Sequence, residues 1–550
     1  MIRGKCARGV MAGIALVWLA SAGTLGAREL PAFKRNGETT QLHLDGRPVV
    51  LISGELHNSS ASSPAYMAPI WDKLARNGVR TVIGTASWEL VEPEEGRFNF
   101  AEVDDQIRQA RQRNQRLVMI WFGAYKNAES TYAPSWVRRD EQRFPRAVRD
   151  PAFKAMGMAA FLKFNPALSA FGKNLASADA RAFAALMRHI RQVDREQTVI
   201  MVQVENEVGL LADSRDRSAP ATAAWEAPVP AELTAYLERR RDALKPHLLQ
   251  LWGRGGFRTS GTWREVFGDD RAAHEVFMAW GFSRYVDEVA KAGAREYPLP
   301  MFANAWLGPQ ARAPEPGDYP SGGPVARMMD VWKAGAPSLA LLAPDIYIDD
   351  FAGTLADFQR DDNPVFIPEA KPEAGNLFLA LGQYRAVGFS PFGIEDVPEG
   401  SELFQAYRAL NTMVPEIVAA QASGTIRAIR LTADGSQRVD LGGYTIAFQA
   451  APPTAGAFGP GTGSAAQAPS PGYALILQVA ADEFVIVGRN VAPRFELPGQ
   501  QVELDTTVEG SFAEGRWVPG RTLNGDERWS LFPTDSLRTV RFRLLRRPAP

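Results

Sequence analysis

The sequence contains almost no cysteine and very little histidine. Of 550 residues, one is cysteine and five are histidine. Cys6 lies before the first apolar run, so no disulfide can form after it and the fold must depend on its hydrophobic core. The histidines are far apart in the sequence: His43, His57, His189, His247 and His274. Since no two of them have the spacing of metal ligands, we expect no metal site.

The sequence also lacks a phosphate-binding loop and an excess of charge. No glycine-rich loop of the GxxxxGK[ST] or GxGxxG type follows an apolar run, which argues against a nucleotide cofactor. The 61 basic residues nearly balance the 62 acidic ones. A near-neutral surface argues against nucleic acid or an anionic membrane as the partner. Hydrolysis without a cofactor is the simplest chemistry that remains.

The N-terminus has the pattern of a secretory signal. Arg3, Lys5 and Arg8 precede an apolar run over residues 10–20, and small-residue cleavage sites follow. This order predicts a signal peptide over residues 1–27 and a bacterial protein of the periplasm or the extracellular medium. Spanning a bilayer takes about 20 apolar residues. The run is shorter, so an uncleaved anchor is the less favoured alternative and we expect no membrane association after cleavage.

Eight short apolar runs alternate with helical stretches in the first two thirds of the chain. The runs are residues 49–54, 79–84, 117–122, 198–204, 299–304, 339–347, 364–369 and 387–393. The amphipathic helical candidates are residues 66–77, 103–113, 178–194, 231–252 and 272–292. Wholly apolar strands separated by helices predict a parallel sheet buried on both faces. Eight such units fit an α/β fold of the (β/α)8 TIM-barrel type. The alternative, a doubly wound sheet, requires a glycine-rich first turn that is absent here.

The two ends of the chain differ from this pattern. Residues 28–48 are a short lead-in with a hairpin over 42–47, built on an Asp-Gly turn. After residue 420 the segments 426–432, 438–448, 473–479, 483–487, 501–507 and 539–545 are strand-like. Residues 451–471, rich in Pro, Gly, Ala and Ser, predict a loop. We therefore expect a catalytic barrel over residues 28–415 and a β-sandwich domain over 416–550.

Two glutamates stand where a barrel carries its chemistry. Catalytic groups lie at the C-terminal ends of barrel strands, and the fourth and seventh runs lead to Glu207 and Glu369. Glycoside hydrolysis needs one protonated carboxyl group and one ionised carboxylate. The alternative is structural: Glu205 and Glu207 alternate on a strand, and one of them pairs with a barrel arginine or lysine. Three consecutive polar residues ending an apolar strand favour the catalytic interpretation.

Other strand ends supply candidate sugar contacts. Asn206 is placed to bind the 2-hydroxyl group. The remaining candidates are Glu55 after the first run, Trp88 after the second, Lys126 and Asn127 after the third, and Trp306 after the fifth. Structural roles compete at several positions: an ion pair for Glu55, rim packing for Trp88, and a helix start or rim ion pair for Glu89 and Glu92. We interpret His57 as a hydrogen-bonded structural histidine, and Glu395 with Asp396 as a solvated rim.

Four motifs carry a family resemblance. Residues 202–209 (VQVENEVG) resemble the acid/base motif of glycoside hydrolase family 35, the β-galactosidases. Residues 93–100 (PEEGRFNF) resemble a stretch that follows strand two in the wider clan of barrel glycosidases. Residues 54–60 (GELHNSS) and 132–136 (YAPSW) resemble a bacterial branch of this family with its own C-terminal β-domain. The resemblance covers roughly residues 40–545.

The resemblance implies roles and a substrate. It assigns Glu207 as acid/base, Glu369 as nucleophile, Asn206 as the partner of the 2-hydroxyl group and Tyr347 as a hydrogen-bond donor to the nucleophile. It implies a secreted, retaining exo-β-galactosidase that releases terminal β-D-galactose from oligosaccharides or polysaccharides, such as plant wall xyloglucan side chains. Val208 departs from the tyrosine of animal and plant members, which bears on the finer sugar contacts.

Two alternatives stay open. The two-carboxylate mechanism does not encode which hydroxyl group is axial, so another retaining β-glycosidase, a β-glucosidase or a mannanase-like enzyme, has the same signature. A carbohydrate-binding protein on a non-catalytic barrel is the alternative from a different class. The sequence does not indicate an oligomeric state.

Overall fold

A computed structural model describes residues 28–163, 165–432, 435–450, 471–513 and 515–548. The predicted signal peptide lies outside these residues, as does nearly all of the loop predicted over 451–471. No helix in the described ranges is long and apolar enough to cross a membrane.

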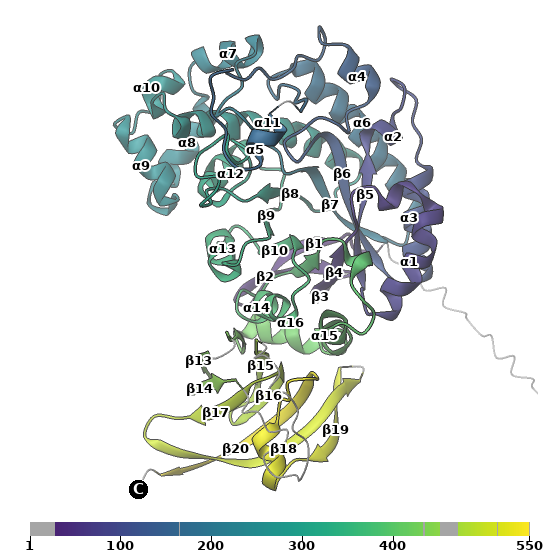
Figure 1. The fold of residues 1–550 in the computed structure, drawn as a ribbon, viewed down its shortest axis with the longest axis vertical. Helices are drawn as coiled ribbons and strands as arrows, with labels where there is room; N and C mark the ends of the chain where they lie inside the picture. Colours follow the sequence, from purple (N-terminus) through teal and green to yellow (C-terminus); the bar gives the residue numbers. More distant parts are fainter. Residues whose placement is uncertain (1–27, 164, 433–434, 451–470, 514, 549–550) are drawn as a thin grey trace, which may run out of the picture.

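Eight parallel strands close into a barrel (Figure 1), which confirms the predicted fold. In chain order they are β4 (Leu51–Glu55), β5 (Thr81–Ser87), β6 (Arg116–Lys126), β7 (Val199–Asn206), β8 (Met301–Trp306), β9 (Leu341–Ile346), β10 (Phe366–Ala370) and β11 (Gly388–Pro391). β11 pairs with β4 to close the ring. The strands are almost entirely buried because apolar side chains fill the barrel on one face and meet the helices on the other.

Helices surround the barrel and form a lobe beside it (Figure 1). They are α1 (Pro64–Arg76), α2 (Trp88–Val91), α3 (Ala101–Gln112), α4 (Ser135–Arg139), α5 (Ala159–Leu162), α6 (Lys173–Val193), α7 (Ala219–Glu226), α8 (Ala231–Arg239), α9 (Pro246–Arg254), α10 (Trp263–Phe267), α11 (Arg271–Glu296), α12 (Met329–Gly335), α13 (Phe351–Phe358), α14 (Ala374–Gly382), α15 (Glu402–Asn411) and α16 (Val414–Ser423). The longest two, α6 and α11, pack closely: a Cβ at Gly293 would lie 2.2 Å from the Phe183 ring.

The prediction of a single helix over residues 231–252 is wrong. The segment forms α8 and α9, separated by a 3-10 turn over Arg241–Ala243. Lys245 precedes Pro246 and is extended, with ψ 137°. Because a proline ring disfavours the helical conformation of the residue before it, α8 cannot continue into α9.

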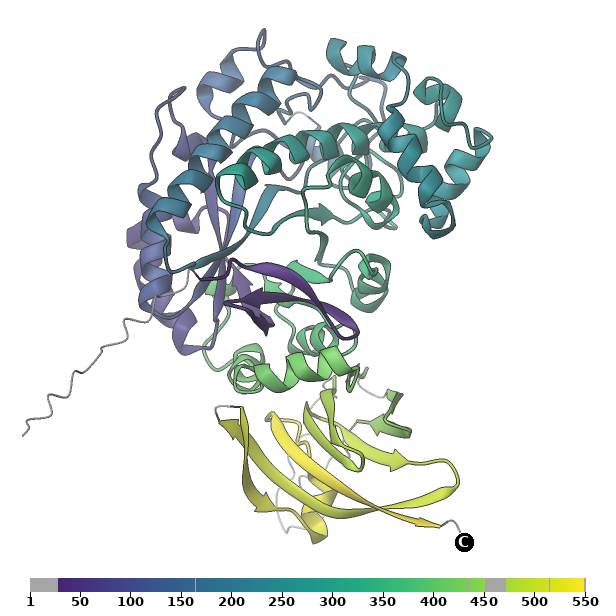
Figure 2. The ribbon, with the colours of Figure 1, turned by 180° about the vertical axis from the view of Figure 1, so that it is seen from behind.

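Three short antiparallel strands precede the barrel: β1 (Ala32–Asn36), β2 (Thr39–Leu44) and β3 (Arg47–Val49). The predicted hairpin is confirmed. Asp45 and Gly46 form its turn with φ of 50° and 75°, the left-handed pair of a type I′ turn. Figure 2 shows this sheet in purple beside the barrel. Leu42 packs with side chains at the starts of the barrel strands, so the sheet covers their N-terminal end.

The C-terminal part is all β, as predicted. One sheet has the order β12-β15-β16-β20-β18-β19 and a second has the order β13-β14-β17, with a hydrophobic core between them. The strands are β12 (Ile426–Arg430), β13 (Ser436–Leu441), β14 (Tyr444–Gln449), β15 (Tyr473–Ala480), β16 (Glu483–Arg489), β17 (Ala492–Glu496), β18 (Gln500–Ala513), β19 (Arg516–Thr522) and β20 (Arg538–Pro548). Helix α16 crosses the predicted domain boundary at residue 415 and is followed by β12.

Two expectations for this part were wrong. Residues 438–448 are not one strand, because Gly442 and Gly443 turn the chain with φ of 60° and 85° between β13 and β14. Strands β17 and β19 were also not predicted from the sequence. Strand β19 lies at the sheet edge with most side chains exposed, so it lacks the apolar alternation of a half-buried strand.

Candidate active site

A cavity of about 450 Å³ opens at the C-terminal ends of the barrel strands. Its lining is Asn58, Lys126, Asn127, Glu207, Trp306, Leu307, Gln310, Asp345, Tyr347, Ile348, Glu369 and Phe392. The volume lies in the usual range for small-ligand sites, about 300–1,000 Å³. Both predicted catalytic glutamates line it, together with four of the seven predicted sugar contacts.

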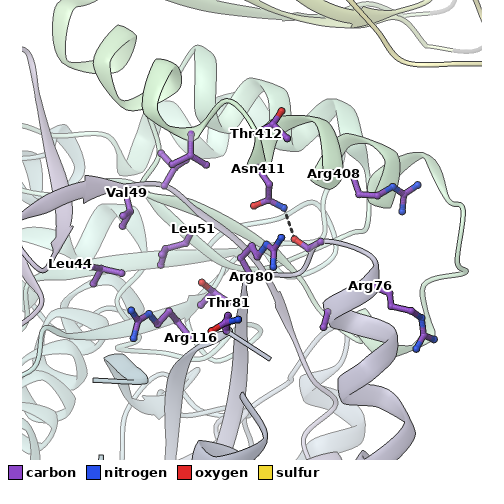
Figure 3. A pocket seen from close by; sticks show the side chains of 15 residues that line it. Leu44, Val49, Leu51, Arg76, Arg80, Thr81, Arg116, Arg408, Asn411 and Thr412 are labelled. Atoms are coloured by element: carbon purple, nitrogen blue, oxygen red, sulfur yellow. Dashed lines mark hydrogen bonds between the residues drawn. The ribbon is translucent and has the colours of Figure 1, made fainter. Parts of the chain in front are cut away.

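A larger cavity of about 520 Å³ lies at the opposite end of the barrel strands (Figure 3). Arg76, Arg80, Arg116 and Arg408 line it and no carboxyl group does. Chemistry that needs two carboxyl groups therefore cannot take place there, and the smaller cavity is the candidate active site.

Backbone strain at the end of β7 directs its polar side chains. Glu205 and Glu207 have φ of 63° and 45°, a left-handed conformation that is unusual for residues with side chains. Such strain persists where the surroundings hold it. The N–H of Glu207 donates to Asn304 Oδ1 at 3.0 Å, and its carbonyl accepts from the N–H of Ala128 at 3.1 Å. These bonds turn Glu207 into the cavity.

Glu205 has a structural role, but its partner is not the arginine or lysine that was expected. It is fully buried and its Oε2 accepts from the backbone N–H of Tyr125 at 2.7 Å. The neighbouring side chain is the carboxyl group of Asp179, not an arginine or lysine. Burial, and next the charge of Asp179, raise the pKa of Glu205 well above its usual range. The two acids therefore hold at least one proton between them.

This acid pair holds an irregular stretch of β6. The pairing of β6 with β7 changes register between Trp121 and Lys126. Asp179 accepts from the Trp121 indole N–H at 2.7 Å and from the backbone N–H of Ala124 at 3.0 Å. The stretch leads into Lys126 and Asn127, so a buried network outside the cavity fixes two residues that line it.

The carboxyl groups of Glu207, Asp345 and Glu369 meet in the cavity. One oxygen atom of each lies within 4.8 Å of the others. Retaining glycosidases hold their two carboxyl groups about 5–5.5 Å apart, and inverting ones about 6.5–9.5 Å apart to admit a water. The spacing of Glu207 and Glu369 fits the retaining geometry.

The surroundings of Glu207 favour its protonated form. Burial, and next the charge of Glu369, raise the pKa of Glu207 to about 8, against the opposing charge of Lys126 and a hydrogen bond with Asp345. A carboxyl group that keeps its proton at neutral pH can act as a general acid.

Glu369 is held by two donors. Asn206 Nδ2 donates to its Oε1 at 3.2 Å, and the Tyr347 hydroxyl donates to its Oε2 at 2.8 Å. Lys126 Nζ donates to Asn206 Oδ1 at 3.0 Å and also to Asn127 Oδ1. Asn206 is fully buried behind the lining. The hydrogen bond from Asn206 therefore holds the Glu369 carboxylate in position. The contact of Asn206 with a sugar 2-hydroxyl group stays a prediction.

Besides Asn206, two predicted sugar contacts do not line the cavity. Trp88 is fully buried, its indole N–H donates to Glu92 Oε2 at 2.7 Å, and its ring packs edge-on against Trp136. The rim-packing alternative is therefore correct for Trp88. Glu55 is also fully buried, beside Glu369, and neither of its carboxyl oxygens has a hydrogen-bond donor among the described residues. Burial, then the charge of Glu369, raise the pKa of Glu55 well above its usual range.

The residues that follow the first and eighth barrel strands are joined by hydrogen bonds. His57 Nε2 lies 2.7 Å from Asp396 Oδ2, which confirms the structural interpretation of this histidine. The interpretation as a solvated rim is correct for Asp396, which is exposed, and wrong for Glu395. Glu395 is buried and its Oε1 accepts from the N–H of His57 at 2.9 Å and from Ser60 Oγ at 2.7 Å.

Asn304 and Asp345 were not among the site residues predicted from the sequence. Both stand at the ends of barrel strands, β8 and β9, so the rule that selected Glu207 and Glu369 would have found them. With Glu207 and Glu369, Asp345 completes the group of carboxylates in the described chain that has the spacing of a cation site. Both oxygens of Glu369 also accept hydrogen bonds from neighbouring side chains.

Comparisons with known proteins bear on the first part of the barrel. Residues 41–166 match the sequence profile of glycosyl hydrolases family 35, and residues 403–533 match that of a domain of unknown function, DUF5597. Residues 41–166 are therefore similar to part of a family 35 domain. The family 35 match spans β4 to β6 and ends before Glu207 and Glu369, so the roles of these two residues rest on their geometry.

Two curated proteins that are similar to part of this chain are named β-galactosidases. The enzyme of Xanthomonas manihotis is 30% identical over 188 residues, 33% of this chain and 27% of that protein. β-Galactosidase 11 of Arabidopsis thaliana is 30% identical over 103 residues, 18% of this chain and 12% of that protein. The chain therefore spans about a quarter or less of the length of these relatives. A solved β-galactosidase from Marinomonas ef1 aligns with a TM-score of 0.43 and 10% identity over 68% of this chain and 60% of its own.

Proposed function

We propose that the chain is a retaining exo-β-galactosidase in which Glu207 is the acid/base and Glu369 the nucleophile. The observation that carries this proposal is the approach of their carboxyl oxygens to within 4.8 Å at the C-terminal end of the barrel. The raised pKa of Glu207, about 8, supports the acid role. The names of the curated relatives support galactose as the sugar.

The first step forms a glycosyl-enzyme. A Glu369 oxygen attacks the anomeric carbon, the bond to the leaving oxygen breaks, and Glu207 gives its proton to that oxygen. Tyr347 and Asn206 hold the attacking carboxylate in place. Once Glu369 is esterified, its negative charge is gone, so the pKa of Glu207 falls.

The second step releases the sugar. Glu207 now takes a proton from water, the water oxygen attacks the anomeric carbon, and the bond to Glu369 breaks. Each step inverts the anomeric centre, so the product keeps the β configuration. Glu207 is protonated again and Glu369 is again a carboxylate.

The cavity supports action at a chain end. Its volume, about 450 Å³, suits one terminal sugar and part of its neighbour. Trp306, which is partly exposed, lies in the lining beside Leu307 and offers a ring face to the aglycone. We also propose, from the N-terminal sequence pattern, that the protein is secreted to the periplasm or the medium. As its substrates we propose galactosides of plant walls, such as xyloglucan side chains.

A panel of aryl β-glycosides, scored by kcat/KM, tests the proposal. We expect the β-galactoside to be the best substrate, ahead of the β-glucoside and β-mannoside, and turnover to disappear in Glu369→Gln. A preference for another sugar would overturn the galactose assignment alone. Binding of galactosides without turnover of any aryl glycoside would favour the non-catalytic alternative.

A further inference from the structure

Three acids meet in the cavity, and only two have a role in the proposed hydrolysis. Asp345 stands in β9, lines the cavity and is 2% exposed. One of its oxygens lies within 4.8 Å of oxygens of both Glu207 and Glu369. A third acid therefore faces the region where the bond would break.

The amide of Asn304 fixes Asp345 relative to Glu207. Asn304 Nδ2 donates to Asp345 Oδ2 at 2.6 Å, and Asn304 Oδ1 accepts from the backbone N–H of Glu207 at 3.0 Å. The other oxygen, Asp345 Oδ1, is buried and meets no donor among the described residues. An ionised carboxylate with a buried oxygen left without a donor is strongly disfavoured. A proton on that oxygen would turn it into a donor facing two acceptors.

The charges around Asp345 act in the same direction. The titratable groups that face the cluster from its several strands are Glu55, Lys126, Glu207, Tyr347 and Glu369. Burial, followed by the charges of Glu369, Glu207 and Glu55, raises the pKa of Asp345 well above its usual range. One ammonium group cannot balance four clustered carboxylates, so some of them must hold protons.

We propose that Asp345 is a positioning residue that stays protonated and donates a hydrogen bond to Glu207, a role that rests on the proposed hydrolysis. When Glu207 gives its proton to the leaving oxygen, its new carboxylate accepts from the Asp345 O–H. The proton of Asp345 stays on Asp345, and no further group is oxidised, reduced or transferred. A neutral carboxylic acid is an effective donor at a buried position because it stabilises negative charge as that charge forms.

Two substitutions of similar size separate a neutral donor from a charge. Asp345→Asn keeps both contacts, since its carbonyl can accept from Asn304 and its amide N–H can donate to Glu207. We expect kcat/KM within about 10-fold of the wild type and an unchanged basic limb of the pH profile. Asp345→Leu has no donor, and removing one such donor costs about 10²–10³-fold. Its basic limb should also move to higher pH, because the hydrogen bond from Asp345 that favoured the Glu207 carboxylate is gone.

The controls separate folding from chemistry. Asp361→Asn, an exposed position outside the cavity, should match the wild type. Thermal melting of Asp345→Leu should show one cooperative transition, and the shift of its pH profile is a readout that a packing defect alone would not produce. Equal damage in Asp345→Asn and Asp345→Leu would overturn the proposal, because it would mean that Asp345 acts as a charge. Wild-type behaviour of both variants would overturn it too.

A second measurement needs no substrate. Infrared spectra at pH 7 of Glu207→Gln and of Glu207→Gln with Asp345→Asn should differ by the carbonyl band of one protonated carboxylic acid. Absence of that band would overturn the protonated form of Asp345. A wild type that is inactive on every galactoside would refute the proposed function and leave this result standing, so the two failures are distinguishable.

Discussion

Replacing Glu207 by Gln should stabilise the protein while it disables catalysis. The pKa of Glu207 rises from 4.5 to about 8 on folding, chiefly through burial. The folded state therefore holds a proton that the unfolded state releases, so folding stability falls as pH rises from about 4.5 to about 8. One pKa unit corresponds to about 1.4 kcal/mol. At pH 7 the penalty is about 3 kcal/mol, and Gln, which cannot ionise, avoids it.

Urea unfolding at several pH values measures this effect. The stability difference between Glu207→Gln and the wild type should grow by about 1.4 kcal/mol for each pH unit between 5 and 7.5. Glu226→Gln is the matched control, because Glu226 is exposed, and it should show no such growth. A difference that stays constant with pH would refute the raised pKa, and with it the acid role of Glu207. The same variant should lose the basic limb near pH 8 from its residual rate profile.

Three further predictions concern the reaction. Glu207→Ala should lose about 10²–10⁴-fold on galactosides with poor leaving groups and less on activated aryl galactosides, with partial rescue by azide; uniform loss across leaving groups would contradict the acid role. Tyr347→Phe removes the donor to Glu369 Oε2 and should lower kcat more than it raises KM; an effect on KM alone would place Tyr347 in sugar binding only. Proton NMR of early hydrolysis should show β-galactose first, and α-galactose first would contradict the retaining geometry.

The sequence predicted those features that repeat along the chain. Apolar β-branched runs separated by helical stretches identified all eight barrel strands, and the rule that chemistry lies at strand ends selected Glu207 and Glu369. Residue type and position along the chain were enough for both. The helix break at Pro246 was also readable, since the residue before a proline is rarely helical, but the long amphipathic pattern hid it.

The sequence could not predict how deeply each of these side chains is buried or which groups it contacts. Trp88 and Trp306 both stand at the C-terminal ends of barrel strands, yet Trp88 is fully buried against Trp136 and Trp306 lines the cavity. Glu395 has the composition of a rim residue, and only the fold brings it to His57. A single sequence records which groups can bond and says little about which of them meet.

Covalent trapping tests the central claim most directly. The wild type is incubated with an activated 2-deoxy-2-fluoro-β-galactoside, whose glycosyl-enzyme turns over slowly, and the labelled peptide is identified by mass spectrometry. We expect one adduct, on Glu369, with none in Glu369→Gln. An adduct on another residue, or steady turnover of other galactosides with no adduct at all, would contradict a nucleophilic role for Glu369.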